Sequence, residues 1–202
     1  MTPASAGVPS RLISTYYDTP DLALKRRGLS LRVREQGGRF IQTVKTTNPG
    51  GIDILKRGEW EDEVAEGCPD PHAAQSGKHL PNGIAGDLQP LFATDVTRTT
   101  FAIEPAPTTR IEAAIDQGEI RAAHGRGAEP ISEIELELKS GDPAALYDVA
   151  LRLLDVAAIR IEPRSKAERG YRLGDEAEAA PSVVHAAPVA IDPTMTVEAA
   201  LQ

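Results

Sequence analysis

The sequence is poor in cysteine and aromatic residues and has no long hydrophobic run. Cys68 is the single cysteine among 202 residues, so no internal disulfide can form. The four histidines lack the spacing of zinc ligands, which argues against a structural zinc site. No apolar stretch reaches the length of about 18 residues that a membrane helix needs, and the N-terminus has no signal-peptide pattern. We therefore expect a cytoplasmic protein without a membrane partner.

Motifs of the common phosphate-binding and nucleophilic enzymes are also lacking. Gly50 and Gly51 are not followed by the Gly-Lys-Ser/Thr of a P-loop, and no nucleophile motif is visible. The net charge of -8 argues against nucleic-acid binding. The charge is nevertheless uneven, because residues 1–57 hold ten basic and four acidic side chains, while residues 58–202 hold twelve and twenty-six. This distribution favours a site in which basic strands meet acidic ones.

The composition is that of one globular domain followed by a tail. Hydrophobic residues make up 41% of the chain and charged residues 26%, which is ordinary for a folded domain. After Arg172 the sequence becomes rich in Ala, Glu and Pro, a composition typical of linkers. The composition therefore predicts a domain over residues 1–174 and a linker over residues 175–202.

Turn residues divide the domain into short segments with the alternation of β-strands. Most connections are too short for parallel crossovers, so the pattern predicts an antiparallel sheet with flanking helices, an α+β fold. Predicted helices cover residues 21–27, a short stretch near 84–92, and most clearly 142–158, where Asp142 and Pro143 suit a helix start. Strands are predicted at 11–17, 29–35, 39–47, 56–64, 94–104, 109–116, 119–123 and 130–139, with turns at 36–38, 117–118 and 125–127.

Charged residues recur at every second position of these strands, so they share one face of the sheet. Arg32 and Arg34 point one way while Leu31 and Val33 point the other. Glu133, Glu135 and Glu137 form a similar row. One interpretation is a sheet whose charges face water, the commonest antiparallel arrangement. Three glutamates on one strand repel each other, however, and this favours a face that meets cations or a ligand.

The two rows suit phosphoryl chemistry if the sheet closes around them. The planar guanidinium of arginine can form paired hydrogen bonds to phosphate oxygens, and lysine adds a compact charge. Glutamate oxygens are ligands for hard cations such as Mg²⁺ or Mn²⁺. In such sites catalysis relies on positioning and charge stabilisation, so no side-chain nucleophile is required.

The ordered motifs resemble those of the CYTH family, also called triphosphate tunnel metalloenzymes, and most closely the bacterial inorganic triphosphatases that carry a CHAD domain. The resemblance implies an antiparallel β-barrel, eight-stranded in the family, that hydrolyses tripolyphosphate with Mg²⁺ or Mn²⁺. The motifs are Tyr16–Pro20, Leu31–Arg34, Thr43–Lys45, Ile115–Glu119, Glu133–Leu138 and Ser165–Tyr171.

The resemblance also implies a role for individual residues. Substrate binding falls to Arg32, Arg34, Lys45, Arg98, Lys166 and Arg169. Glu133 and Glu135, with Lys166, are the implied catalytic residues. The implied metal ligands are Glu133, Glu135 and Glu137, with Glu59, Glu61, Asp116 and Glu119 as further candidates.

One part of the family pattern has no counterpart in this chain. The family opens with a Glu-x-Glu-x-Lys strand, whereas residues 1–10 contain neither Glu nor Lys. The resemblance therefore predicts an N-terminally truncated domain without its first strand, and a linker that leads toward a missing CHAD domain. An open sheet edge would invite pairing with another chain, so a homodimer is possible.

Three functions remain open from the sequence. The first is hydrolysis of inorganic or organic triphosphate. The second is a class IV adenylate cyclase activity on ATP, which presents the same triphosphate to the site. The third is a non-catalytic module that binds polyphosphate or nucleotides. The partner in every case is a triphosphate-containing small molecule.

Overall fold

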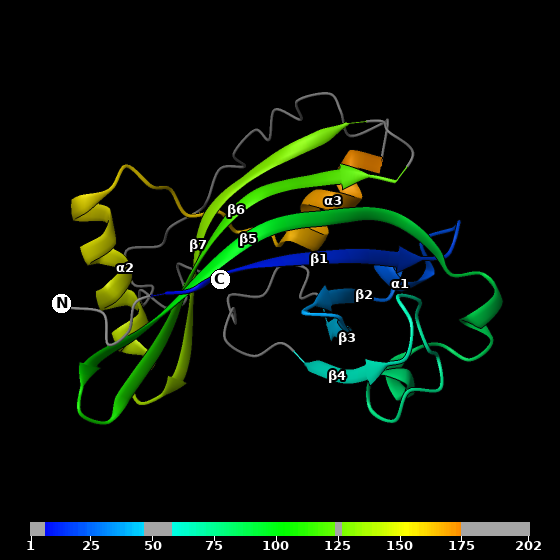
Figure 1. The fold of residues 1–202 in the computed structure, drawn as a ribbon, viewed down its shortest axis with the longest axis horizontal. Helices are drawn as coiled ribbons and strands as arrows, with labels where there is room; N and C mark the ends of the chain where they lie inside the picture. The colour runs from blue at the N-terminus through cyan, green and yellow to red at the C-terminus, as the bar shows by residue number, and fades with distance from the viewer. Residues whose placement is uncertain (1–6, 47–57, 124–126, 175–202) are drawn as a thin grey trace, which may run out of the picture.

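The computed structural model describes residues 7–46, 58–123 and 127–174, and it contains one antiparallel sheet (Figure 1). The seven strands follow the order β4-β3-β2-β1-β5-β6-β7. Within the described residues no ladder joins β4 to β7, so the sheet curls without closing. The α+β class and the antiparallel, tunnel-like sheet are confirmed. The strands are β1 (Pro9–Asp18), β2 (Leu29–Gln36), β3 (Arg39–Thr46), β4 (Glu59–Val64), β5 (Gln89–Ala106), β6 (Thr109–Ala122) and β7 (Ala128–Ser140).

The hairpin between β2 and β3 forms where turn residues predict it. Gln36 pairs with Arg39, which leaves Gly37 and Gly38 as the two-residue loop. Their φ angles are 60° and 79°, a conformation that only glycine adopts without strain. Such a loop matches the twist of the flanking strands and sets their register. Arg32 and Arg34 lie two residues apart on β2, so they share one face of this strand.

The turn predicted at residues 117–118 is wrong, because β6 runs through both positions. Gly118 pairs with Val96 on one side and with Ile131 on the other. A Cβ atom at Gly118 would lie 2.0 Å from the carbonyl oxygen of Asp95. Glycine is needed here because the backbone of β5 approaches closely. A glycine that serves this purpose cannot be told in the sequence from a glycine that forms a turn.

The helix predicted near residues 84–92 is wrong beyond Gly86. Two short 3₁₀ helices, η1 (Ser76–His79) and η2 (Ile84–Gly86), are followed by β5, which starts at Gln89. Gln89 already pairs with Asp18 of β1. Strand pairing across the sheet therefore determines this segment, against its local helical pattern.

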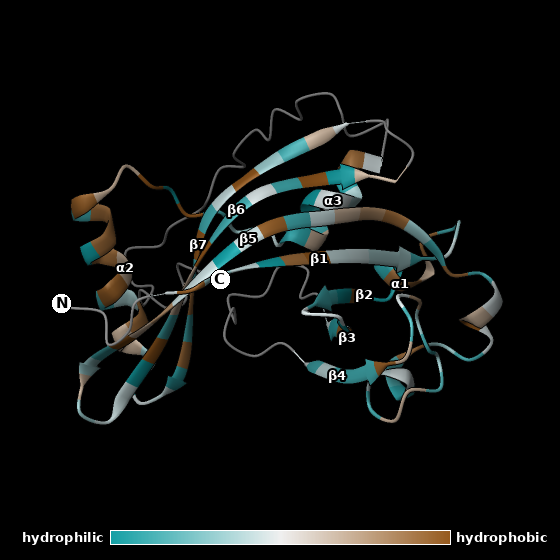
Figure 2. Ribbon diagram, viewed as in Figure 1, coloured by the Kyte–Doolittle hydropathy of each residue, from teal (hydrophilic) through white to brown (hydrophobic). Residues whose placement is uncertain are grey.

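Three α-helices accompany the sheet: α1 (Ala23–Arg26), α2 (Ala144–Val156) and α3 (Lys166–Gly174). The predicted cap of α2 is confirmed, since Asp142 Oδ1 accepts a hydrogen bond from the Ala144 N–H at 2.9 Å. Val149 is buried, whereas Tyr147 and Leu151 are more than 60% exposed. Figure 2 shows apolar residues along α2, so this helix covers the sheet with only part of its apolar surface. None of the helices in the described ranges is long and apolar enough to cross a membrane.

The core divides into two clusters on opposite faces of the sheet. Arg32 pairs with Tyr16, while its neighbour Leu31 pairs with Tyr17 and points the other way. On the first face the rings of Tyr16 and Phe92 stack with centroids 4.5 Å apart, and α3 packs there. The second face is covered by α1 and the two 3₁₀ helices. Helix α3 therefore lies on the same face as the charged residues.

Candidate active site

Charged side chains from both halves of the sheet gather on one surface, which we call the charged face. It carries Arg32, Arg34, Arg98, Asp116 and Glu135. The register places Arg98, Asp116 and Glu133 in line, because Arg98 pairs with Asp116 and Asp116 pairs with Glu133 on the next strand. Residues paired in this way point to the same side. The predicted meeting of basic and acidic rows is thus present in the tertiary structure.

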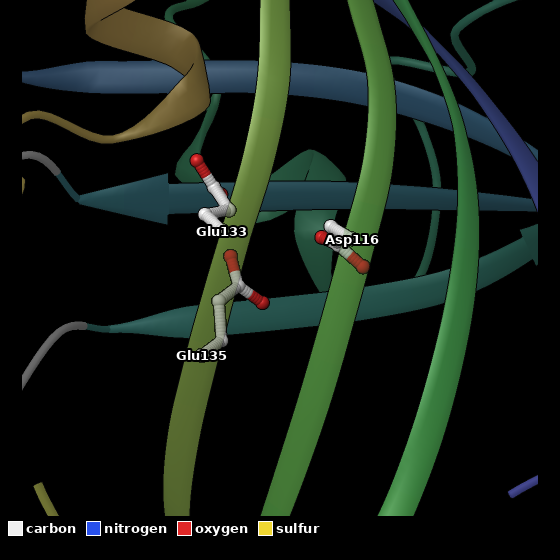
Figure 3. A group of neighbouring side chains, drawn as sticks. All are labelled: Asp116, Glu133 and Glu135. Atoms are coloured by element: carbon white, nitrogen blue, oxygen red, sulfur yellow. The ribbon is translucent and has the colours of Figure 1, made fainter. Parts of the chain in front are cut away.

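Three carboxylates form the acidic group of this face: Asp116, Glu133 and Glu135. One oxygen of each lies within 4.8 Å of the others. Figure 3 shows Glu133 and Glu135 projecting from β7 beside Asp116 of β6. The Asp116 side chain is fully buried, and the Glu135 side chain is about half exposed. Three clustered carboxylates are a donor set that fits a hard divalent cation.

Two cationic side chains contact the acidic group directly. Arg98 donates from Nε and Nη2 to the two oxygens of Asp116, each at 2.7 Å, and also contacts Glu135. Lys166 Nζ lies 2.7 Å from Asp116 Oδ2 and 2.7 Å from Glu135 Oε1, and it also contacts Glu133. These pairs neutralise much of the charge that the group would otherwise carry in a poorly solvated position.

Arg169 is held entirely by protein acceptors. Its guanidinium donates to Glu129 at 2.6 Å, to Glu133 at 2.7 Å and to the Pro130 carbonyl at 2.8 Å. The side chain is 7% exposed. The predicted role of Arg169 in substrate binding stays a prediction, but this geometry favours positioning of Glu133.

Burial and ion pairing oppose each other in setting the protonation of the acidic group. Burial disfavours the charged form of Asp116, but hydrogen bonds from Arg98 and Lys166 outweigh it and lower its pKa. The pKa of Glu135 is lowered for the same reasons. Burial alone would lower the pKa of Lys166, yet the surrounding carboxylates raise it. Asp116 and Glu135 are therefore ionised and Lys166 is protonated at neutral pH.

Acid is expected to destabilise the fold through Asp116. A carboxyl whose pKa is lowered by folding stabilises the protein above its ordinary pKa of 3.8 and loses that contribution as the pH falls. Protonation of this buried, paired carboxyl therefore lowers the free energy of unfolding. Urea unfolding of Asp116→Asn should accordingly depend less on pH below about 5 than unfolding of the wild type does. Asp148→Asn, exposed on α2, should keep the wild-type profile. An Asp116→Asn profile as steep as that of the wild type would contradict this prediction.

Arg34 is the cation of the charged face that has no carboxylate partner in the described residues. Its Nε donates to the Ser14 hydroxyl at 3.3 Å. Burial, followed by repulsion from Arg32 and Arg98, lowers the pKa of Arg34 to about 10. It remains charged at neutral pH, so folding here costs free energy that an anion would recover.

Arg32 and Lys45 face two carboxylates of β4. Arg32 Nη2 lies 3.8 Å from Glu59 and 3.8 Å from Glu61, distances too long for hydrogen bonds. Within the described residues, Arg32 Nε is the buried side-chain nitrogen without a hydrogen-bond partner. Lys45 pairs with Glu59 at 2.8 Å. Glu59 and Glu61 therefore line the charged face but lie outside the acidic group.

Two other predicted metal ligands also lie outside the acidic group. Glu137 belongs to the same row as Glu135, but it is 65% exposed and pairs with Lys139 at 2.8 Å. Glu119 lies three residues after Asp116 in an uninterrupted strand, so it points to the opposite face. There it contacts Arg121. The tertiary structure thus brings together Glu133, Glu135 and Asp116 from the predicted set.

The sequence analysis missed helix α3, although a capping box marks its start. The Ser165 N–H donates to Glu168 Oε2 at 2.6 Å, and the Glu168 N–H donates to Ser165 Oγ at 3.2 Å. This reciprocal pattern, Ser-x-x-Glu, is a sequence signal for a helix N-terminus. It places Lys166 in the first turn of α3, beside the acidic group.

Asp18 is a second missed residue, and it anchors the far end of α3. Its carboxylate accepts hydrogen bonds from the N–H groups of Thr19, Leu24 and Lys25, at 2.7 to 2.9 Å. Tyr171 donates its hydroxyl proton to the same carboxylate at 2.9 Å. The sequence signal was an Asp in the Asp18–Pro20 turn, and the structure shows its side chain to be fully buried. Through Tyr171, Asp18 holds the helix that carries Lys166 and Arg169.

Solved structures share this architecture. A candidate adenylyl cyclase from Hippeastrum, described as having a dominant triphosphatase activity, aligns with a TM-score of 0.59 at 14% identity. The alignment covers 80% of this chain and 82% of that one. The protein PH1819 from Pyrococcus horikoshii OT3 aligns with a TM-score of 0.53 at 18% identity, over 81% and 85% of the two chains. At these identities the likeness establishes the fold.

Sequence comparison identifies the family. The chain is 36% identical over 167 residues to an inorganic triphosphatase from Haemophilus influenzae. That alignment covers 81% of this chain and 46% of the Haemophilus protein, so the chain spans about half the length of its relative. The family model of the CYTH domain matches residues 4–171. With its curled antiparallel sheet and its charged face, this chain belongs to the CYTH domain family.

Proposed function

We propose that this chain catalyses the metal-dependent hydrolysis of a triphosphate bound on the charged face. The observation that carries the proposal is the environment of Arg34, a partly buried cation with no ionic partner in the described ranges, close enough to Arg32 and Arg98 to be repelled by both. A partly buried cation without an ionic partner fits an anionic ligand, and guanidinium groups suit phosphate oxygens. The relationship to an inorganic triphosphatase supports the same substrate class.

Phosphate binding and metal binding fall to different halves of the charged face. Arg32 and Arg34 of β2 and Lys45 of β3 bind the phosphate oxygens of the substrate. Asp116, Glu133 and Glu135 hold Mg²⁺ or Mn²⁺, which when bound neutralises charge on the phosphate oxygens.

The carboxylates of the acidic group also orient the attacking water. Arg98 contacts both Asp116 and Glu135 at the junction of the two halves, where it meets the developing charge of the leaving phosphate. The predicted cytoplasmic location and homodimer stay predictions.

The direct test is phosphate release from tripolyphosphate with Mg²⁺ and with Mn²⁺. The same protein is then given ATP, and the products are separated into phosphate and cyclic AMP. Release of phosphate supports hydrolysis, whereas cyclic AMP would favour the cyclase alternative. Tight binding of tripolyphosphate without any product under all these conditions would leave a non-catalytic binding module and overturn the proposal.

Arg34→Met is expected to raise the KM for tripolyphosphate at least about tenfold, because a charge-assisted contact to phosphate is lost. Arg39→Met provides the matched control. Arg39 belongs to the neighbouring strand, but its side chain is 65% exposed and pairs with Glu63. Steady-state kinetics should show little change in the control. An equal rise in KM for both variants would mean that substrate binding depends on the overall positive charge of the surface and not on a specific contact with Arg34.

A further inference from the structure

We infer that Lys166 is an exchangeable internal counter-ion, which occupies the acidic group until a divalent cation displaces it. The inference deepens the proposed function, because it concerns the same site and rests on metal binding there. Its basis is the division of carboxylate oxygens among the neighbouring cations. On each of the two glutamates one oxygen is held by an arginine and the other by the single ammonium of Lys166, whereas Arg98 and Lys166 share Oδ2 of Asp116.

Each arginine takes one oxygen of a glutamate. Arg98 holds Oε2 of Glu135, and Arg169 holds Oε2 of Glu133 at 2.7 Å. Lys166 Nζ takes the other oxygen of each glutamate, Oε1, and also Oδ2 of Asp116. A single nitrogen thus contacts all three members of the group.

A metal ion would need these same oxygens. Mg²⁺ binds carboxylate oxygens at about 2.0 to 2.1 Å, closer than any ammonium contact, and it would repel the neighbouring positive charge. The two cations therefore compete for one position. At the glutamates the arginines can remain in place because they reach the opposite oxygens, while at Asp116 the metal would compete with both Arg98 and Lys166 for Oδ2.

The surrounding structure allows the lysine side chain to leave while the helix stays. Lys166 is the first residue of α3 and carries its charge on a flexible four-carbon chain. The helix itself is anchored further along by Tyr171, whose hydroxyl binds Asp18 at 2.9 Å. Arg169, in contrast, donates to three protein acceptors and stays as a positioning residue. Once displaced, the Lys166 ammonium becomes available to a phosphate oxygen.

Amine acetylation followed by mass spectrometry tests the exchange directly. The protein is treated with an N-hydroxysuccinimide acetate ester, with and without Mg²⁺ and in the absence of any phosphate compound. The Lys166 side chain is 12% exposed and should react slowly without the metal. With Mg²⁺ its rate should rise at least about fivefold as the population shifts to the displaced state.

Lys139 is the matched internal control. It also contacts two carboxylates, Glu137 at 2.8 Å and Glu112 at 3.6 Å, but both lie outside the acidic group. Its acetylation rate should not change with Mg²⁺. A Lys166 rate that stays constant, or falls, at a Mg²⁺ concentration that saturates the protein would overturn the inference.

Equilibrium dialysis with Mn²⁺ supplies a second readout. Lys166→Met should bind Mn²⁺ about tenfold more tightly than the wild type, because no internal cation competes. Lys139→Met should bind it unchanged. Equal or weaker binding by a folded Lys166→Met protein overturns the exchange.

The exchange and the proposed function can fail separately. If Mg²⁺ displaces Lys166 but tripolyphosphate is not hydrolysed, the exchange stands and the proposed function fails. If tripolyphosphate is hydrolysed while Lys166 stays protected from acetylation, the proposed function stands and the exchange fails.

Discussion

Glu135→Gln is expected to lower metal-dependent hydrolysis of tripolyphosphate by about 100- to 1000-fold. Glutamine keeps the size of the side chain but removes one of three charges from the acidic group. The carboxylate that pairs with Arg98 and Lys166 becomes a neutral amide. A divalent metal that replaces Lys166 would therefore have one charged ligand fewer and would bind less tightly. The loss should appear in kcat measured with saturating Mg²⁺, since the interaction is needed most at the transition state.

Glu137→Gln is the control for this prediction, because it makes the same chemical change two residues along the same row. Glu137 is 65% exposed and pairs with Lys139, outside the acidic group. Its loss should change activity by less than about threefold, as expected for an exposed ion pair. If both variants lost activity equally, the glutamate row would act through its overall charge and the assignment of the acidic group would fail. Circular dichroism of both proteins confirms that each is folded.

Gly170→Val should lower the free energy of unfolding by about 3 kcal/mol, the upper range for overpacking a core. A Cβ atom at Gly170 would lie 2.1 Å from a ring carbon of Phe92. The ring cannot retreat easily, since Phe92 is 1% exposed, stacks on Tyr16 and meets Tyr171 edge-on. Helix α3 would therefore have to lift from the sheet, and Lys166 would move away from the acidic group.

Gly174→Val is the control on the same helix. Among the residues that the structure describes, no atom would lie within 4 Å of a Cβ atom at Gly174, so the effect of this substitution on unfolding should stay within about 0.5 kcal/mol. Urea unfolding followed by far-ultraviolet circular dichroism gives both values. A Gly170→Val protein as stable as the Gly174→Val protein would show that α3 is not packed on the sheet as described.

Alternation along single strands was predictable because it depends on local geometry alone. Arg32 and Arg34 share a face, as do Glu133 and Glu135, for the simple reason that side chains two apart point the same way. The same rule fails when the strand itself is misjudged. With a turn at residues 117–118, Glu119 could have pointed to the same face as Asp116. Because β6 is continuous there, Glu119 points to the other face.

Which of the many carboxylates would meet could not be read from the sequence. Asp116 joins Glu133 because β6 and β7 pair in one particular register, and a register shift of one residue would have moved every side chain to the other face. Lys166 joins them from a segment some thirty residues later, through the close packing of Gly170 on Phe92. Neither contact follows from local propensity, since both depend on long-range pairing.

The sequence by itself determined the antiparallel strands, their charged and apolar faces and the residue types suited to phosphate and metal. These properties follow from side-chain alternation, turn chemistry and charge, which act over a few residues. Only the tertiary structure decided that Glu119 and Glu137 lie outside the acidic group, that Arg169 is held by protein acceptors, and that Lys166 contacts all three carboxylates. The physical reason is that burial and ion pairing are set by distant segments, whose approach depends on register and on the packing of α3.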